Sequence, residues 1–292
     1  MEAEKNSFTS SSNRVGRVVT AFATCAVVLG LYTALIGAGK VPPGEGVSQA
    51  QMNVVRLQRM IEDPAVQPEV VLAGSSIAAN LKVQAVDPGF LNLGVYGGSS
   101  QDALDAVLRS GKTPKLVIVE MTFWISRGLD PKLNHTLTDP ANRFLYQNFP
   151  FVRPEYQPVN VALSAVKRRR EPPNSVPSEA AQRATAERLI AETNFDTKGK
   201  ILEDVEWIKE AVAKLESRGV RVIYVDLPID PTIENSAGYS MNKALWHDAI
   251  GDESKFARFP GSESLRATDG WHLVRDDAKK VAEWLVSLHR AQ

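Results

Sequence analysis

Short apolar runs rich in valine, isoleucine and leucine alternate along the chain with segments that carry apolar residues at helical spacing. The apolar runs predict strands that are covered on both faces, as parallel strands are; they lie at 69–74, 90–95, 115–121 and 220–227. The amphipathic segments predict helices at 101–111, 200–219 and 276–292. This alternation predicts an α/β fold, a doubly wound three-layer sandwich with a mostly parallel sheet and right-handed crossovers.

The boundaries of two of these helices have recognisable signals. Ser99 or Ser100 is a candidate N-cap for the first helix, Asp102 lies in capping-box register with Ser99, and Gly111 is a candidate stop. Gly219 is expected to end the second helix in the same way.

The amino-terminal region predicts a membrane segment. Residues 18–39 contain no charged residue, and a helix needs about 20 apolar residues to cross a bilayer. Arg14 and Arg17 precede the segment and only Lys40 follows closely, which favours a cytoplasmic amino terminus and an extracytoplasmic domain. We expect an uncleaved single-pass anchor; the rival interpretation is a signal peptide cleaved after the small residues at 37–39.

The anchor interpretation divides the chain into four parts. They are a cytoplasmic tail at 1–17, the transmembrane anchor at 18–39, a Pro- and Gly-containing linker at 40–50 and a folded domain at 51–292.

One long segment, at about 125–200, interrupts the alternation of strands and helices. An insertion of this length at a sheet edge is typical of a lid, a substrate platform or a disordered excursion. Its basic run at 167–170 is either solvated or contacts an anionic glycan or lipid head groups. Its aromatic residues either stack on sugar rings or form the core of the insertion; they are Phe144, Tyr146, Phe149, Phe151 and Tyr156.

Composition excludes several classes of protein. The 292 residues carry 34 basic and 34 acidic side chains, which argues against a strongly basic nucleic-acid-binding protein. The single cysteine, Cys25, lies inside the apolar segment and excludes an internal disulfide framework. The four histidines lack the spacing of a zinc helix, so we expect neither a metal nor another cofactor.

Two short motifs carry candidate chemistry. Gly74-Ser75-Ser76 follows the first predicted strand, where a turn into a helix either presents a reactive hydroxyl or is only a tight turn. Asp269 and His272 stand three residues apart before the last helix. A carboxylate at that spacing can orient the imidazole, leaving Nε2 to take a proton from a serine, although such a histidine is also common as a capping residue.

The order of these motifs resembles the SGNH (GDSL-like) hydrolase and acyltransferase family. Ser76 stands at the nucleophile position of that family, with Ser75 where Asp is usual. Residues 92–97 match the second block, Asn-x-Gly-x-x-Gly, and Asp269 and His272 match the last. The resemblance implies a triad of Ser76, His272 and Asp269, with an oxyanion hole formed by the backbone N–H groups of Ser76 and Gly97.

The third block departs from the family pattern. Residues 119–124 contain no Asn to donate a side-chain N–H, an ionised Glu120 cannot donate, and Thr122 donates only if its hydroxyl points towards the oxyanion. We name four possible neighbours of the site: Ser75, Asn92, Thr122 and Trp271. Trp271 either lines an acyl pocket or anchors the last helix.

The resemblance implies a membrane-anchored enzyme of a bacterial envelope, with its domain in the periplasm or at the cell surface. It would be an O-acyltransferase or an esterase acting on an envelope polysaccharide; the same triad serves both reactions, so this alternative stays open. The expected partners are an acyl donor, a glycan and a multi-span membrane acyltransferase, and nucleic acid is not among them. The missing Asn favours a second hypothesis, a catalytically weak glycan-binding or scaffold protein.

Overall fold

The computed structural model describes residues 7–122, 127–169, 178–192 and 198–290, and these form two compact units. Unit 1 is drawn from the ranges 1–47 and 139–170, and unit 2 from 48–138 and 171–292. The predicted insertion is therefore shared between the units, and parts of it, at 170–177 and 193–197, lie outside the described residues.

Unit 2 is built on a five-stranded sheet in the order β2-β1-β3-β4-β5, with every pair parallel. The strands are β1 (Val70–Ala73), β2 (Phe90–Asn92), β3 (Leu116–Glu120), β4 (Arg221–Asp226) and β5 (Phe256–Arg258). From β1 the chain turns to β2 on one side and then returns to β3 on the other, which places a topological switch point at the carboxyl end of β1. Ligands of open α/β sheets bind at such a point.

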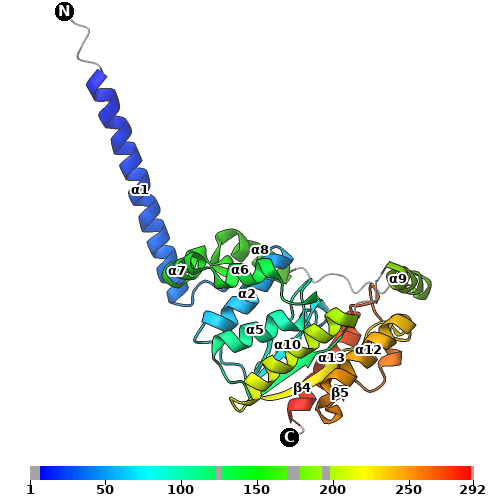
Figure 1. The fold of residues 1–292 in the computed structure, drawn as a ribbon. Coiled ribbons are helices and arrows are strands. Elements are labelled where there is room, and N and C mark those ends of the chain that lie inside the picture. Colours follow the sequence, from blue (N-terminus) through cyan, green and yellow to red (C-terminus); the bar gives the residue numbers. More distant parts are fainter. Residues whose placement is uncertain (1–6, 123–126, 170–177, 193–197, 291–292) are drawn as a thin grey trace, which may run out of the picture. The chain divides into compact units, whose positions relative to one another are not determined.

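Helices cover both faces of this sheet, and Figure 1 shows α5 and α10 against the strands on one of them. Alternate residues of β1 point to opposite sides, so that Val71 and Ala73 join one apolar core and Val70 and Leu72 join the other. The first core contains residues of α2 (Gln49–Glu62), α5 (Ser100–Ser110), α10 (Lys198–Glu216) and α12 (Ala237–Ile250). The second contains residues of α3 (Ser76–Ala79), α4 (Val83–Val86), α9 (Glu179–Glu192), α11 (Pro231–Glu234) and α13 (Arg275–Arg290). The α/β sandwich predicted from the sequence is confirmed.

The remaining elements of unit 2 are short. They are α6 (Pro131–Thr138) and the 3₁₀ turns η4 (Glu253–Lys255) and η5 (Ser262–Ser264).

The four strands predicted from apolar runs are confirmed, whereas β5 was missed. It has three residues at the sheet edge, only partly buried, so it shows neither a long apolar run nor a regular alternation. Of the two cap candidates for α5, Ser99 is the N-cap: it forms the capping box with Asp102, and Gly111 ends the helix at φ 66°.

Unit 1 consists of α1 (Ser7–Gly37), α7 (Pro140–Asn148), η2 (Pro150–Val152), η3 (Pro154–Tyr156) and α8 (Pro158–Arg169). The Tyr32 hydroxyl of α1 donates to the Tyr156 carbonyl at 2.7 Å, and Glu45 N–H donates to Ser164 Oγ of α8 at 2.9 Å. The side chains of the basic run at 167–170 lie outside the described part of the chain.

Helix α1 is long and apolar enough to cross a membrane over Arg14–Gly37, which are 24 residues. A signal sequence near the amino terminus would have the same length and composition. The helix begins at Ser7, earlier than the predicted anchor, because the polar residues before Arg14 continue the same helical backbone.

We predict that the close approach of β2 and α3 requires glycine at position 94. A Cβ there would clash with the backbone of Ala78 and Ala79. Gly94→Ala is therefore expected to lower the free energy of unfolding by about 1–3 kcal/mol, measured by denaturant unfolding of the detergent-solubilised chain. Gly199→Ala is the matched control: its Cβ would meet nothing within 4 Å, so stability should be unchanged or slightly higher. Equal effects of the two substitutions would refute this packing argument.

Candidate active site

The candidate nucleophile lies on a tight connection between β1 and α3. Strand β1 is fully buried, Gly74 follows it, and Ser75 is the N-cap of α3, with its Oγ accepting from Ile77 N–H at 3.1 Å. Ser76 is the first residue of α3 and is half-buried. The sequence Gly-Ser-Ser thus provides both a cap and an accessible hydroxyl at the carboxyl edge of the sheet.

A buried carboxylate beneath this turn holds it in place. Glu120, at the end of β3, accepts from Ser75 N–H at 2.7 Å and from Ser75 Oγ at 2.8 Å, and Ala78 N–H lies 3.4 Å from its Oε2. Gly74 passes so close that a Cβ would clash with the Glu120 carboxylate. Glu120, one of the residues 119–124 that contain no Asn, therefore bonds to the turn that carries Ser76.

The same burial changes the chemistry of Glu120, whose side chain is 2% exposed. Burial raises the pKa of the Glu120 carboxyl above its usual value of 4.5. The hydrogen bonds from Ser75 and Ala78 favour the charged form and oppose this rise in pKa without cancelling it.

The histidine is held by a second turn, which precedes α13. Ala267 and Leu273 form an isolated antiparallel bridge, and Thr268 N–H donates to the His272 carbonyl at 2.7 Å. Asp269 Oδ1 accepts from the His272 N–H at 2.8 Å and Gly270 adopts φ 87°, which closes the turn. One oxygen of Asp269 therefore orders the backbone, and the other is available to the ring.

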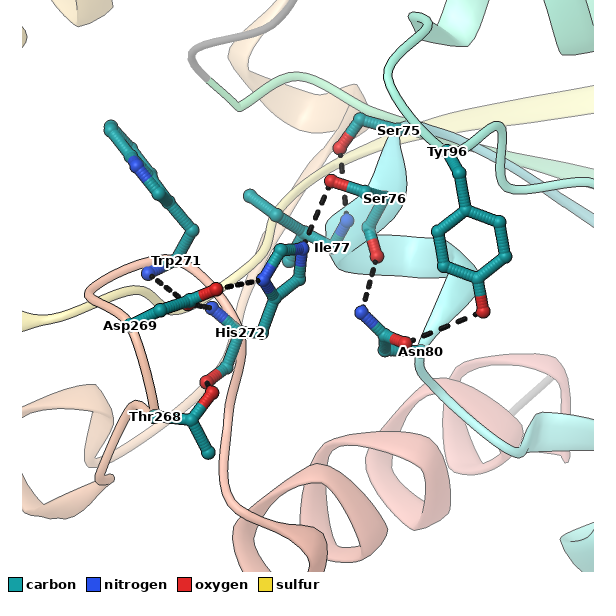
Figure 2. Close-up of polar contacts among 9 residues, drawn as sticks. All are labelled: Ser75, Ser76, Ile77, Asn80, Tyr96, Thr268, Asp269, Trp271 and His272. Atoms are coloured by element: carbon teal, nitrogen blue, oxygen red, sulfur yellow. Dashed lines mark hydrogen bonds and ion pairs between the residues drawn. The ribbon is translucent and has the colours of Figure 1, made fainter. Parts of the chain in front are cut away.

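These two turns bring together residues that are 196 positions apart in the chain. The Asp269 Oδ2 is 2.7 Å from His272 Nδ1, and His272 Nε2 is 3.0 Å from Ser76 Oγ. Figure 2 shows the imidazole of His272 between the carboxylate and the hydroxyl. Partial burial disfavours the charged form of Asp269, but hydrogen bonds from the ring and backbone of His272 outweigh it and hold the pKa of Asp269 below its usual value. An ionised Asp269 favours the tautomer with the proton on Nδ1, which leaves Nε2 as a base.

The loop after β2 places Gly97 near Ser76 and His272. Tyr96 N–H donates to Asn53 Oδ1 at 2.9 Å, and Asn53 Nδ2 returns a bond to the Tyr96 carbonyl at 2.8 Å. Gly97 has φ 71°, and Arg127 Nη1 donates to its carbonyl at 2.6 Å. This backbone conformation is one that glycine adopts without strain.

Ser76, Gly97, Asp269 and His272 line one pocket of about 400 Å³. The rest of its lining was not identified from the sequence: Gln49, Asn80, Tyr96, Gly98 and Arg127, of which all but Gly98 have a polar group in the side chain. Asn80 Nδ2 donates to the Ser76 carbonyl at 3.0 Å, and the Tyr96 hydroxyl lies 3.4 Å from Asn80 Oδ1, as Figure 2 shows. Asn80 could have been predicted as a neighbour of Ser76 from its helical spacing, because residues i and i+4 lie on the same face of a helix.

The four predicted neighbours lie outside that lining. Ser75 is the buried cap bonded to Glu120, and Asn92 is buried, donating to the carbonyls of Ala78 and Leu81 at 2.7 Å each. Thr122 is buried beside Glu120, and Trp271 packs in the apolar core that contains α13. Ser75 and Asn92 therefore support the segment that carries Ser76, and none of the four lines the pocket.

No group of three or more His, Cys, Asp or Glu side chains that could hold a metal ion occurs among the described residues.

Comparison with known proteins gives no family for the chain. No protein-family model and no curated protein matches it. One similar solved structure, described as a "putative platelet activating factor" from Streptococcus pneumonia, has 12% sequence identity, covers 91% of this chain and 98% of its own, and has a TM-score of 0.43. A likeness of that degree says nothing about the site.

We predict that Glu120 makes stability depend on pH. Because its folded-state pKa is raised above the unfolded value of 4.5, the folded state loses stability as pH rises above that value. Glu120→Gln removes this titration but weakens the bonds to Ser75, at a cost of about 1–3 kcal/mol. The advantage in unfolding free energy of wild type over the variant should therefore be largest below pH 4.5 and shrink as pH rises above that value, measured by urea titrations. A difference that is constant with pH would contradict the assignment.

Proposed function

We propose that this chain is a serine-dependent acyl-transfer enzyme of the SGNH type, anchored in a cell membrane and acting on an envelope polysaccharide. The observation that carries the proposal is the continuous chain of contacts from Asp269 through His272 to Ser76, which opens into a polar pocket. Nucleophile, base and orienting group are within hydrogen-bond reach, as this chemistry requires.

In the proposed mechanism His272 Nε2 takes the proton of Ser76 Oγ as the oxygen attacks the carbonyl carbon of an acyl ester or thioester. The tetrahedral oxyanion accepts from the backbone N–H groups of Ser76 and Gly97. The bond to the leaving group then breaks, and His272 returns the proton to that group. A hydroxyl of the acceptor or a water molecule repeats these steps in reverse and frees Ser76.

The absent Asn of the third block leaves room for another donor. Among the side chains with N–H groups that line the pocket are Asn80 and Arg127. Each donates to a backbone carbonyl of a proposed oxyanion-hole residue, Asn80 to Ser76 and Arg127 to Gly97. We propose that these two side chains take over the support that the missing Asn gives in the family, by orienting those residues and adding positive potential beside the oxyanion.

The proposed location rests on α1 and on the charges around it. Arg14 and Arg17 before the apolar stretch and Lys40 after it favour a single-pass anchor with a cytoplasmic amino terminus. Unit 2 would then face the periplasm or the cell surface, where glycan hydroxyls and acylated glycans are the available substrates. A multi-span membrane acyltransferase is the partner that would deliver the acyl group across the bilayer.

Exposure of the site is consistent with a large substrate. The side chains of His272 and Asp269 are 26% and 51% exposed, so the triad is reached from the surface rather than through a closed tunnel. A polymer can approach such a site with one sugar unit, whereas a deep apolar pocket would favour a small hydrophobic ester.

The alternative function is a catalytically weak glycan-binding or scaffold protein of an envelope acylation complex, which the missing Asn favours. A pure binding site has no need of an ionised carboxylate, an imidazole and a hydroxyl in line, so we rank it second.

We predict that Ser76→Ala and His272→Ala each abolish hydrolysis of p-nitrophenyl acetate by the detergent-solubilised chain, because they remove the nucleophile and its base. Labelling by a fluorophosphonate should vanish in Ser76→Ala and fall strongly in His272→Ala. The matched controls are Ser287→Ala and His135→Ala, which change exposed residues outside the pocket. Activity that survives in folded Ser76→Ala would rule out the triad, and inactivity of the folded wild type towards both probes would favour the binding-protein alternative.

We further predict that the acyl group passes to sugar hydroxyls in preference to water, since the pocket lining offers polar side chains that can bind a sugar. Wild-type enzyme incubated with p-nitrophenyl acetate and envelope oligosaccharides should give O-acetylated oligosaccharides, detected by mass spectrometry, and Ser76→Ala should give none. Release of free acetate alone, with every acceptor tested, would assign the chain as an esterase.

A further inference from the structure

Helix α8 of unit 1 has its polar and apolar faces reversed relative to a helix of a soluble protein. Asn160 and Ser164 are buried, at 1% and 3% exposure, whereas Val159, Leu163 and Val166 are 64%, 43% and 50% exposed. The three apolar residues follow helical spacing and form one stripe. A helix of a water-soluble protein buries such a stripe against the protein core. Because the stripe of α8 is exposed, we expect it to face an apolar environment.

Hydrogen bonds fix the helix in this orientation. Asn160 Nδ2 donates to the Pro154 carbonyl at 2.6 Å, and Ser164 Oγ accepts from Glu45 N–H at 2.9 Å. The segment before Glu45 lies tightly against α8, since a Cβ on Gly44 would come within 2.8 Å of the Asn160 carbonyl oxygen. Rotating α8 to bury its valines would break these contacts and leave buried polar groups without partners.

A second exposed apolar cluster lies on α7 and the residue after it. Phe144, Leu145 and Phe149 are 61%, 41% and 41% exposed, and α7 has no buried residue. The rings of Phe144 and Phe149 pack edge to face at 6.4 Å between centroids. We call these three residues, together with Val159, Leu163 and Val166, the apolar platform.

The platform is tied to the carboxyl-terminal end of α1. Figure 1 shows α7 beside that end of the helix, and the Tyr32 hydroxyl donates to the carbonyl of Tyr156, the last residue of η3. The 24 residues of Arg14–Gly37 extend about 36 Å, longer than the roughly 30 Å of a hydrocarbon core. Tyr32 therefore lies close to the boundary between lipid and water, where tyrosine is common, and the residues bonded to it lie at the same level.

We propose that the apolar platform rests on the membrane surface, with its six side chains in the boundary between head groups and acyl chains. The inference rests on α1 being a membrane anchor, as stated under the proposed function, and is independent of the catalytic mechanism. The sequence has basic residues at 167–170, the last three positions of α8 and the one after it, which suits contact with anionic lipids. The anchor would then be reinforced by an interfacial contact that prevents unit 1 from tumbling about a single helix.

The test uses the full chain, with Cys25→Ala to remove its one cysteine, in vesicles of phosphatidylcholine with a minority of phosphatidylglycerol. Single cysteines at Leu163→Cys, Val28→Cys and Glu210→Cys carry an environment-sensitive fluorophore. Val28 is an exposed residue of α1, and Glu210 is an exposed residue of α10 in unit 2. Quenching is measured with doxyl-labelled lipids and with aqueous iodide.

We expect the label at position 163 to be quenched several-fold more by shallow doxyl lipids than the label at 210, and to be shielded from iodide. Adding Val159→Ser and Val166→Ser, which change exposed residues only, should reduce lipid quenching at 163 and leave circular dichroism unchanged.

If position 28 contacts lipid but position 163 is open to iodide, the platform proposal fails while the anchor stands. Shielding of 163 from both quenchers would show that protein covers the face and would also overturn the proposal. If position 28 does not contact lipid, the anchor itself fails, and the platform proposal fails with it.

Discussion

The hydrogen bonds between buried Glu120 and Ser75 are the interaction on which the candidate site depends. They join the end of β3 to the turn after β1, so two neighbouring strands share one rigid edge. Gly74 is required because the carboxylate occupies the space of a side chain, and Ser76 is presented by the same turn. Burying a carboxylate costs free energy unless it is hydrogen-bonded, and the partners of Glu120 are the N–H and hydroxyl of Ser75 in the turn before Ser76.

The site is assembled from three connections that leave the same edge of the sheet. The turn after β1 carries Ser76, the loop after β2 carries Gly97, and the turn before α13 brings His272. Each connection is stabilised by separate hydrogen bonds: the cap at Ser75, the paired bonds that join Tyr96 to Asn53 of α2, and the bonds of Asp269 to the backbone. The contact between Ser76 and His272 therefore joins two turns that are each held by other hydrogen bonds. Proton transfer between two side chains requires that both are held in position in this way.

Unit 1 illustrates a different constraint: whether water or lipid surrounds its exposed side chains. Its buried side chains include Asn160 and Ser164, and its exposed ones include Val159 and Phe144, a distribution that is unfavourable in water. The same distribution is favourable beside a bilayer, where apolar side chains lose contact with water and polar groups must pair within the protein. In the proposed arrangement, the anchor and the platform are two consequences of one environment, the lipid bilayer.

The sequence by itself determined the α/β class and four of the five strands, because these depend on local periodicity. It narrowed the cap of α5 to Ser99 or Ser100, and the order of its motifs pointed to Ser76, Asp269 and His272 as candidate site residues. Only the tertiary structure decided how they meet: the distance from Ser76 to His272, the bond from Glu120 to Ser75 and the place of Asn80 and Arg127 in the pocket. It also decided that Trp271 packs in the core and that α8 turns its valines outwards. These features depend on contacts between distant segments, and the sequence of one segment does not specify which residues of another will face it.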